Sequence, residues 1–190
     1  MASRPDSPLL IFDAGPLETF AAAGDPAWHA FWGRYGQRAR WTDAVRDEVE
    51  GRIRRGRPWL TRVRTTLGAS AIDLSADASQ TEIDAVRERI RRENDPSTFH
   101  VGEAATIVAA AHLGAVAVID DADAYTVAKA LGLQVVRGLD LLDAIVRSDG
   151  LSCQDAWEAY GRMRAHSRLP VRQRWELCPP ACGRHGRPVG

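Results

Sequence analysis

The sequence HVGEAATIVAAAHLGAVAVIDDADAYTVAKALGLQVV spans residues 100–136 and predicts a helix, a strand, a second helix and a second strand with almost no connecting loop. Glu103 opens the first of these helices, and the run AVAVID brings Asp120 and Asp121 to the tip of the strand. Acidic side chains at such positions are costly in a hydrophobic core. They are well suited to a metal site, so further acids are to be sought elsewhere in the chain.

The N-terminal part of the chain predicts another strand that ends in an acid. Residues 8–12 read PLLIF, an apolar run typical of a buried parallel strand, and the Ala-Gly-Pro that follows Asp13 leads into a helix. Asp13 therefore lies at the carboxyl end of this strand. A short strand is expected over residues 39–41, and the helix expected over residues 43–55 carries Glu48 in its first turns.

Strands and helices alternate along the rest of the chain. We expect a strand over residues 69–74, a charged helix over residues 78–93, and helices after Gly138 and Ser152. This alternation predicts a central parallel sheet with helices on both faces, which is a three-layer α/β/α sandwich.

The length and composition are those of one globular domain. The chain has 190 residues, of which 45% are hydrophobic and 26% are charged. We expect a single domain over residues 1–168 and an irregular tail, rich in Pro, Gly and Arg, over residues 169–190. The formal net charge is zero, so any contact with nucleic acid depends on local basic patches.

The sequence also lacks the marks of a secreted or membrane protein. No segment approaches the ~20 consecutive apolar residues of a membrane span, and the N-terminus does not have the pattern of a signal peptide. Three cysteines do not suggest a disulfide framework, so we expect a cytoplasmic protein. Cys178, Cys182 and His185 cluster in the tail, but a zinc site needs a fourth ligand, which Cys153 or His166 would have to supply.

Acids from distant parts of the chain are predicted to converge. Asp13 and the pair Asp120 and Asp121 follow strands, and open α/β sheets bind ligands beyond the carboxyl ends of their strands. Glu48 and Glu103 lie near the beginnings of helices that pass the same edge. Unpaired carboxylates in one pocket repel each other, so one or more takes up a proton. A divalent cation removes this conflict, and carboxylate oxygens suit Mg²⁺ or Mn²⁺.

Structural roles remain open for the same acids. Asp13 can be a cap at the end of its strand, and Glu103 can be a first-turn glutamate that the helix dipole favours. Of Asp120 and Asp121, one is expected to cap the following helix and the other to bind the metal, with Asp121 the favoured ligand. The position of Glu48 depends on the register of its helix, because other acids lie near it.

Arg52, Arg54, Arg55 and Arg57 cluster at the end of the helix expected over residues 43–55 and just beyond it. Arginine at a helix C-terminus interacts favourably with the helix dipole. A patch that binds the phosphate backbone of RNA is the alternative interpretation.

Four segments resemble PIN-domain nucleases, in particular the VapC-type toxins of bacterial toxin–antitoxin pairs. They are LLIFDAGPLETF, TDAVRDEVE, HVGEAATIVAAAHLG and AVAVIDDADAYTVAKALGLQVVRGLDLL, in this order. The resemblance implies a sandwich around a parallel sheet and a Mg²⁺- or Mn²⁺-dependent endoribonuclease. It carries the catalytic and metal-site acids onto Asp13, Glu48, Glu103 and Asp121, with Asp120 and Asp123 as further candidates.

Two positions depart from the pattern of the family, and both bear on how a substrate is positioned. Tyr125 stands where an arginine commonly follows the paired aspartates, and Ala14 stands where threonine or serine often follows the first acid.

We therefore predict a nuclease that hydrolyses RNA, the toxin of a toxin–antitoxin pair, with RNA, a cognate antitoxin and a second copy of the chain as partners. In this hypothesis Asp13, Glu103 and Asp121 hold the metal, and Glu48 supports it or positions the water. The alternative is a non-catalytic PIN-fold scaffold that binds RNA or a partner protein. A phosphatase of the haloacid dehalogenase type is disfavoured, because Gly15 stands where its second acid is required.

Overall fold

The chain folds around a four-stranded parallel sheet. The structure, a computed structural model, describes residues 7–68, 71–75, 77–92, 95–96, 99–167, 169–173 and 176–178. The strands are β1 (Leu10–Phe12), β2 (Ala39–Arg40), β3 (Val116–Val118) and β4 (Val135–Val136), and they lie in the order β2-β1-β3-β4. The chain runs from β1 to β2 on one side and returns to β3 on the other. The switch point, where such sheets bind ligands, is therefore at the carboxyl ends of β1 and β3.

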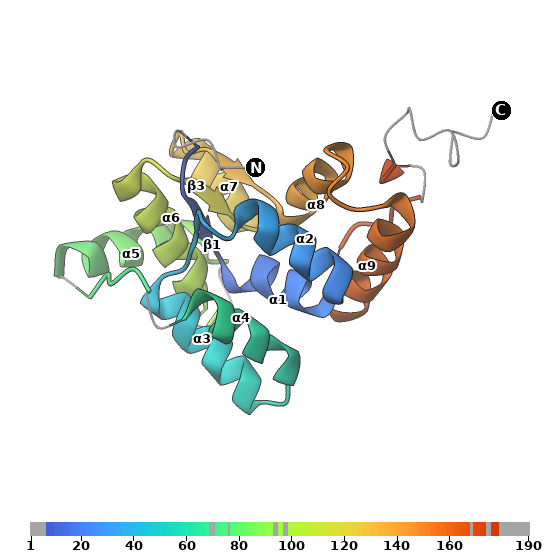
Figure 1. The fold of residues 1–190 in the computed structure, drawn as a ribbon. Coiled ribbons are helices and arrows are strands. Elements are labelled where there is room, and N and C mark those ends of the chain that lie inside the picture. The colour runs from blue at the N-terminus through green and yellow to red at the C-terminus, as the bar shows by residue number, and fades with distance from the viewer. Residues whose placement is uncertain are drawn as a thin grey trace.

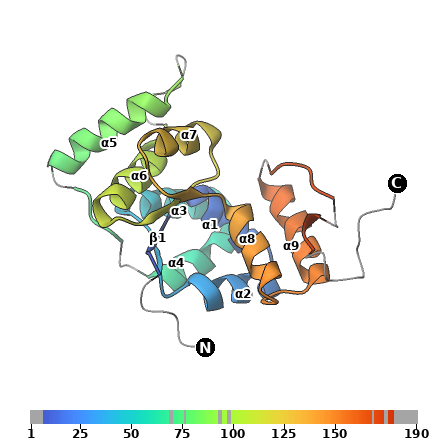
Figure 2. The same cartoon turned by 90° about the horizontal axis from the view of Figure 1, so that it is seen from above.

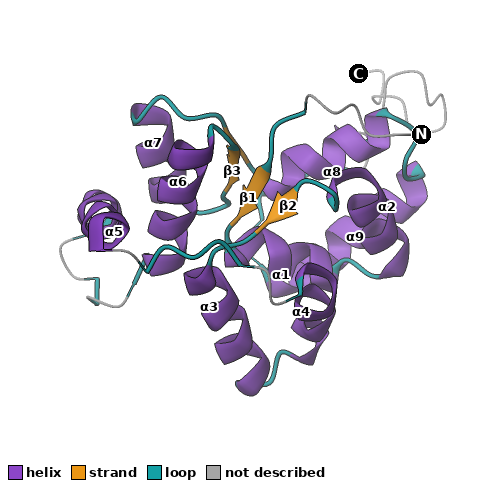
Figure 3. Ribbon diagram, turned by 60° about the vertical axis from the view of Figure 1, so that its left-hand side comes forward, coloured by secondary structure: helices purple, strands orange, loops and turns teal. Residues whose placement is uncertain are grey.

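Helices cover both faces of this sheet. The helical elements are α1 (Ala14–Ala22), α2 (Asp25–Tyr35), α3 (Asp43–Arg54), η1 (Pro58–Leu60), α4 (Thr61–Leu67), α5 (Asp77–Ile90), α6 (Val101–Leu113), α7 (Ala122–Ala130), α8 (Gly138–Arg147) and α9 (Cys153–His166). Helices α6 and α7 lie on one face, and α1, α2, α8 and α9 lie on the other (Figure 1; Figure 3). Figure 2 shows α5 outermost, beyond α6 and α7. The predicted three-layer sandwich is confirmed.

Strand β1 shows how one short strand serves two cores. Leu10 and Phe12 pack with residues of α1, α2 and α8, whereas Ile11 packs with residues of α5, α6 and α7. Successive side chains of a strand point to opposite faces, so a strand that is covered on both faces is apolar throughout. In the described part of the chain, no helix has both the length and the apolar content that a membrane span requires.

The prediction of a strand over residues 69–74 is wrong for the part that the structure describes. Within residues 71–75, one parallel bridge joins Ile72 to Thr42, and residues 69 and 70 lie outside the described ranges. Thr42 is the N-cap of α3, and its hydroxyl accepts the N–H of Val45 at 3.3 Å. The segment that pairs with Ile72 thus begins helix α3 directly after Thr42. Pairing therefore stops after one bridge, and residues 71–75 do not form a strand.

The described part of the C-terminal tail returns along α9. Residues 169–173 form neither helix nor strand. The hydroxyl of Tyr160 donates to the carbonyl of Pro170 and accepts the N–H of Arg172 at 2.9 Å. Leu177 is 3% exposed and belongs to the core that contains α9. This segment is irregular but packed against the domain.

Phe31 on α2 provides a test of the packing on this face. Its ring centroid lies 4.0 Å from that of Phe20 and 5.5 Å from that of Phe12, and the side chain is fully buried. Phe31→Ala should lower the free energy of unfolding by about 3–5 kcal/mol in urea titrations. Val171→Ala, at a residue that is 72% exposed, should change it by less than about 0.5 kcal/mol. A loss below about 1 kcal/mol for Phe31→Ala would contradict the core described here.

Candidate functional site

Asp13 is held at the switch point by the backbone on both sides of it. Its N–H donates to the carbonyl of Val118 at 3.0 Å, which extends the pairing of β1 with β3 by one residue. Its Oδ2 accepts the N–H of Gly15 at 3.1 Å and so caps α1. The residue is 4% exposed, and Oδ1 is buried without a hydrogen-bond partner among the described residues. Asp13 is therefore a cap, as one interpretation predicted, and it also presents a free oxygen.

Glu48 from α3 meets Asp13 against the first turn of α6. A Cβ atom built on Gly102 would lie 2.7 Å from Oε2 of Glu48 and 3.3 Å from Oδ1 of Asp13. The absence of a side chain at Gly102 is what allows two carboxylates to approach the same piece of backbone. The register of α3 thus brings Glu48 to the candidate site, whereas its neighbour Asp47 has a side chain that is 71% exposed.

Glu103 adds a third carboxylate beside Asp13 and Glu48, and its charge affects the pKa of Asp13. Burial raises the pKa of Asp13 well above its usual value, and the charges of Glu103 and Glu48 raise it further. Burial also raises the pKa of Glu103, against the lowering effect of its own backbone N–H, and the charges of Glu48 and Asp121 add to the increase. The charges of Glu48 and Asp121 therefore lie close enough to Asp13 or Glu103 to oppose the ionisation of these two buried acids.

The side chains of Asp121 and Asp120 point in different directions, that of Asp121 towards the start of α7 and that of Asp120 towards the start of α8. Oδ1 of Asp121 accepts the N–H groups of Asp123 and Ala124 at 3.0 and 2.9 Å and caps α7, while its charge acts on Glu103. Oδ1 of Asp120 accepts the N–H of Gly138 at 2.8 Å, at the start of α8. The structure thus brings Asp121 to the other acids and does not bring Asp120 there. Burial, as the largest cause, raises the pKa of Asp120.

Asp123, the other candidate near the paired aspartates, is turned to the surface. Its Oδ2 accepts the Nε–H of Arg92 at 2.8 Å, and this ion pair joins α7 to the segment that follows α5.

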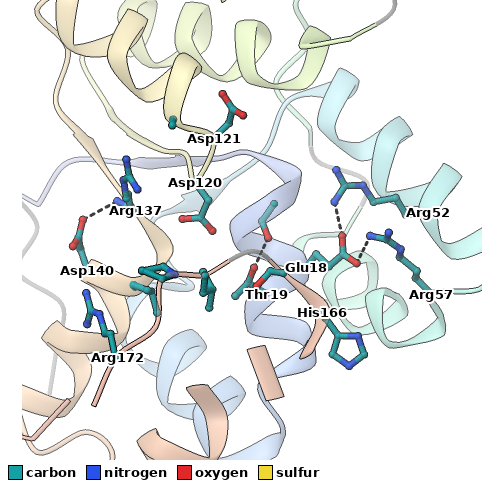
Figure 4. A pocket seen from close by; sticks show the side chains of 16 residues that line it. Glu18, Thr19, Arg52, Arg57, Asp120, Asp121, Arg137, Asp140, His166 and Arg172 are labelled. Atoms are coloured by element: carbon teal, nitrogen blue, oxygen red, sulfur yellow. Dashed lines mark hydrogen bonds and ion pairs between the residues drawn. The ribbon is translucent and has the colours of Figure 1, made fainter. Parts of the chain in front are cut away.

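Glu18 was not predicted to belong to the site. It lies on α1, is 4% exposed, and accepts hydrogen bonds from both Arg52 and Arg57 (Figure 4). The second terminal nitrogen of Arg52 binds Oε1 of Glu48, so Arg52 joins Glu18 to Glu48. The available signal in the sequence was an acid between the apolar residues Leu17 and Phe20.

The four arginines predicted to contact RNA therefore differ in their surroundings. Arg52 and Arg57 are ion-paired with acids, Arg55 lines the pocket next to Glu48, and Arg54 is exposed.

Two open pockets flank the acids. One has a volume of about 570 Å³ and is lined by Glu48, Glu103, Arg55, His100 and other residues of the first turn of α6. The other has a volume of about 660 Å³ and includes Asp120 and Asp121 in its wall (Figure 4). His100 has a φ of 64°, which is rare for a residue other than glycine, and its Nδ1 lies 3.8 Å from Oε1 of Glu103.

The donor set fits a hard divalent cation. Within the described ranges, no group of three or more His, Cys, Asp or Glu side chains is already arranged to hold a metal ion. The unpartnered Oδ1 of Asp13 and Oε2 of Glu48 nevertheless face the same residue, Gly102, and every candidate ligand is a carboxylate. Oxygen ligands of this kind suit Mg²⁺ or Mn²⁺. Of the candidate zinc ligands of the tail, Cys178 is a free cysteine, and Cys182 and His185 lie outside the described residues.

A Gly102→Ala substitution tests this geometry. The added methyl group meets Glu48 and Asp13, so the variant should bind Mn²⁺ about 10–100-fold more weakly in calorimetry, on the scale known for disturbed metal ligands. Gly161→Ala is the matched control, because a Cβ there meets nothing within 4 Å. Equal Mn²⁺ affinity in the two variants would show that the acids at Gly102 do not bind the ion.

The raised pKa of Asp13 predicts an unusual dependence of stability on pH. Because the folded state holds this proton more tightly than the unfolded state, the metal-free protein should lose stability as pH rises from about 4, the ordinary carboxyl pKa, through the raised pKa. Asp13→Asn keeps the cap and removes the charge. Urea titrations in EDTA should find this variant more stable than the wild type at pH 8, with the difference vanishing as pH falls towards 4. A wild type more stable than the variant at pH 8 would refute this electrostatic account.

A family model described as a PIN domain matches residues 9–169, which include every acid discussed above. No curated protein and no solved structure was found to match the chain.

Proposed function

This chain belongs to the PIN-domain family, whose members are generally nucleases, and on that premise we propose that it is a Mg²⁺- or Mn²⁺-dependent endoribonuclease that hydrolyses RNA phosphodiester bonds. The observation that carries the proposal is the buried, unpartnered Oδ1 of Asp13 beside Glu48 and Glu103. Carboxylates buried in this way destabilise a folded protein. We propose that these buried carboxylates are present because they bind a cation.

In this proposal the acids have different roles. Asp13, Glu103 and Asp121 hold the ion, and Glu48 supports it or accepts a proton from the attacking water through Oε2, the oxygen that Arg52 does not bind. When bound, the ion supplies a water of lowered pKa and stabilises charge on the phosphate. Arg52, which is itself bound to buried Glu18, restricts the rotation of Glu48. The hydrolysis requires no covalent nucleophile from the chain.

We further propose that the chain acts in the cytoplasm as the toxin of a toxin–antitoxin pair, with a cognate antitoxin and a second copy of the chain as partners. The likeness of four sequence segments to VapC-type toxins supports this finer proposal. A short neighbouring reading frame that encodes a DNA-binding protein would agree with it. Growth arrest that such a protein fails to relieve would contradict it.

A non-catalytic scaffold is the second candidate function. Arg52 occupies one oxygen of Glu48, and in the described residues no preformed group of three metal ligands exists, so a protein that never binds an ion is compatible with these contacts. Calorimetry with Mn²⁺ separates the two candidates, because the nuclease must bind the ion and the scaffold need not.

Asp13→Asn tests the nuclease directly. The variant should cleave single-stranded RNA in Mn²⁺ or Mg²⁺ about a hundredfold more slowly or worse, the scale on which loss of one preorganised electrostatic group acts. Asp47→Asn is the control, because Asp47 lies on the helix of Glu48 with a largely exposed side chain. Asp47→Asn should cleave like the wild type, and both variants should melt cooperatively. Undiminished cleavage by a folded Asp13→Asn variant would exclude the proposed site.

A further inference from the structure

The pocket of about 660 Å³ lies beside the acids but has a chemistry of its own. Its wall is built by α1, by the ends of α3 and α9, by the first residues of α7 and α8 and by the returning tail (Figure 4). Its volume is within the range of about 300–1,000 Å³ that is usual for pockets that hold small ligands. Asp121, which acts on Glu103, belongs to the same wall, so a molecule in this pocket lies next to the candidate site.

Four arginines line this pocket, and three of them are already neutralised. Arg52 and Arg57 bind Glu18, and Arg172 binds both carboxylate oxygens of Asp143 at 2.8 Å. In each of these three side chains, a carboxylate therefore pairs with the guanidinium and neutralises its charge.

Arg137 is different from the other three. Its guanidinium lies over the ring of Tyr125, with Cζ 4.8 Å from the ring centroid, and has no ion-pair partner among the described residues. The backbone N–H of Arg137 donates to Asp140 at 2.9 Å, and the next N–H, that of Gly138, donates to Asp120. Asp140 and Asp120 therefore fix the backbone at Arg137 and Gly138, and the ring of Tyr125 fixes the guanidinium of Arg137.

We propose that this pocket is a subsite for a backbone phosphate of RNA, and that Arg137, held on Tyr125, is the side chain that binds it. The inference rests on the proposed ribonuclease function and names a residue that positions its substrate. A planar guanidinium presents paired donors that match phosphate oxygens, and its restricted orientation lowers the cost of ordering it when RNA binds. From a phosphate bound in this pocket, the RNA backbone can extend towards Asp121 and the acids beyond it.

Arg137 also has a structural role that the test must separate. It lies close enough to Asp120 to favour the ionised form of that buried carboxylate, and therefore to lower its pKa. A purely structural arginine affects the stability of the protein. It leaves the affinity for RNA and the salt dependence of that affinity unchanged, because only a phosphate contact releases counterions.

The experiment measures RNA binding without cleavage. A fluorescein-labelled single-stranded oligoribonucleotide is titrated by anisotropy with the full chain carrying Asp13→Asn, in EDTA and at several salt concentrations. Adding Arg137→Gln should weaken binding about tenfold and reduce the slope of log K against log salt by about 0.7, the contribution of one phosphate on a single strand. Arg137→Lys keeps the charge, so it should retain the slope and have intermediate affinity.

Arg38→Gln provides the matched control. Arg38 also lies over a tyrosine, with Cζ 5.7 Å from the ring of Tyr35, but it precedes β2 and so stands at the opposite edge of the sheet. This variant should bind RNA like its parent. Tyr125→Phe should do so too, whereas Tyr125→Ala should lose affinity together with the support of Arg137.

Equal affinity of the Arg137→Gln and Arg38→Gln variants would overturn the subsite, as would a parent chain that binds no RNA. Lower thermal stability of Arg137→Gln with unchanged RNA binding would assign Arg137 a structural role alone and would also overturn it. The outcome is independent of cleavage. If the wild type fails to cleave RNA but binding still depends on Arg137, the nuclease proposal fails and the subsite is supported.

Discussion

The Asp13 carboxylate is buried, and one of its oxygens has no hydrogen-bond partner in the described part of the chain, which is the constraint on which the candidate site depends. The sheet imposes it, because the backbone of Asp13 pairs with β3 and its Oδ2 caps α1, which leaves Oδ1 to face α6. Glycine at position 102 then allows Glu48 to approach the same point. Burial and neighbouring charges raise the pKa values of Asp13 and Glu103, so a cation bound by these two carboxylates would couple cation binding to the stability of the fold.

Ion pairs around Glu48 hold its side chain in place. Buried Glu18 binds two arginines, and one of them, Arg52, reaches Glu48. Two arginines at the end of α3 and just beyond it, Arg52 and Arg57, thus orient carboxylates at or beside the candidate site. Arg137, whose guanidinium forms no ion pair within 4 Å among the described residues, is the side chain that we propose faces an anionic substrate.

Local patterns predicted the parallel strands of the sheet, because each depends on residues a few positions apart. They also predicted that Asp13, Glu48, Glu103 and Asp121 converge, and the structure brings these four acids near one another, while their roles as metal ligands stay predictions. Asp121 was favoured over Asp120 as the ligand, with the helix cap assigned to the other aspartate, but Asp121 itself caps α7 and also acts on Glu103, whereas Asp120 accepts the N–H of Gly138. Adjacent residues at a strand end point to opposite sides, and the sequence pattern does not say where the strand stops. The bridge from Glu18 to Arg52 joins residues 34 positions apart, and no local signal reports such a contact. The strand expected over residues 69–74 was wrong because its neighbour turns into α3 at Thr42.

The central claim is that the acids around Asp13 form a cation site whose occupation displaces protons. Calorimetric titration of the wild type with Mn²⁺, repeated across pH in buffers of different ionisation enthalpy, tests it most directly. The account predicts binding that tightens as pH rises through the raised pKa of Asp13 and that releases protons to the buffer. Binding that is absent, or that is independent of pH with no proton release, would contradict it.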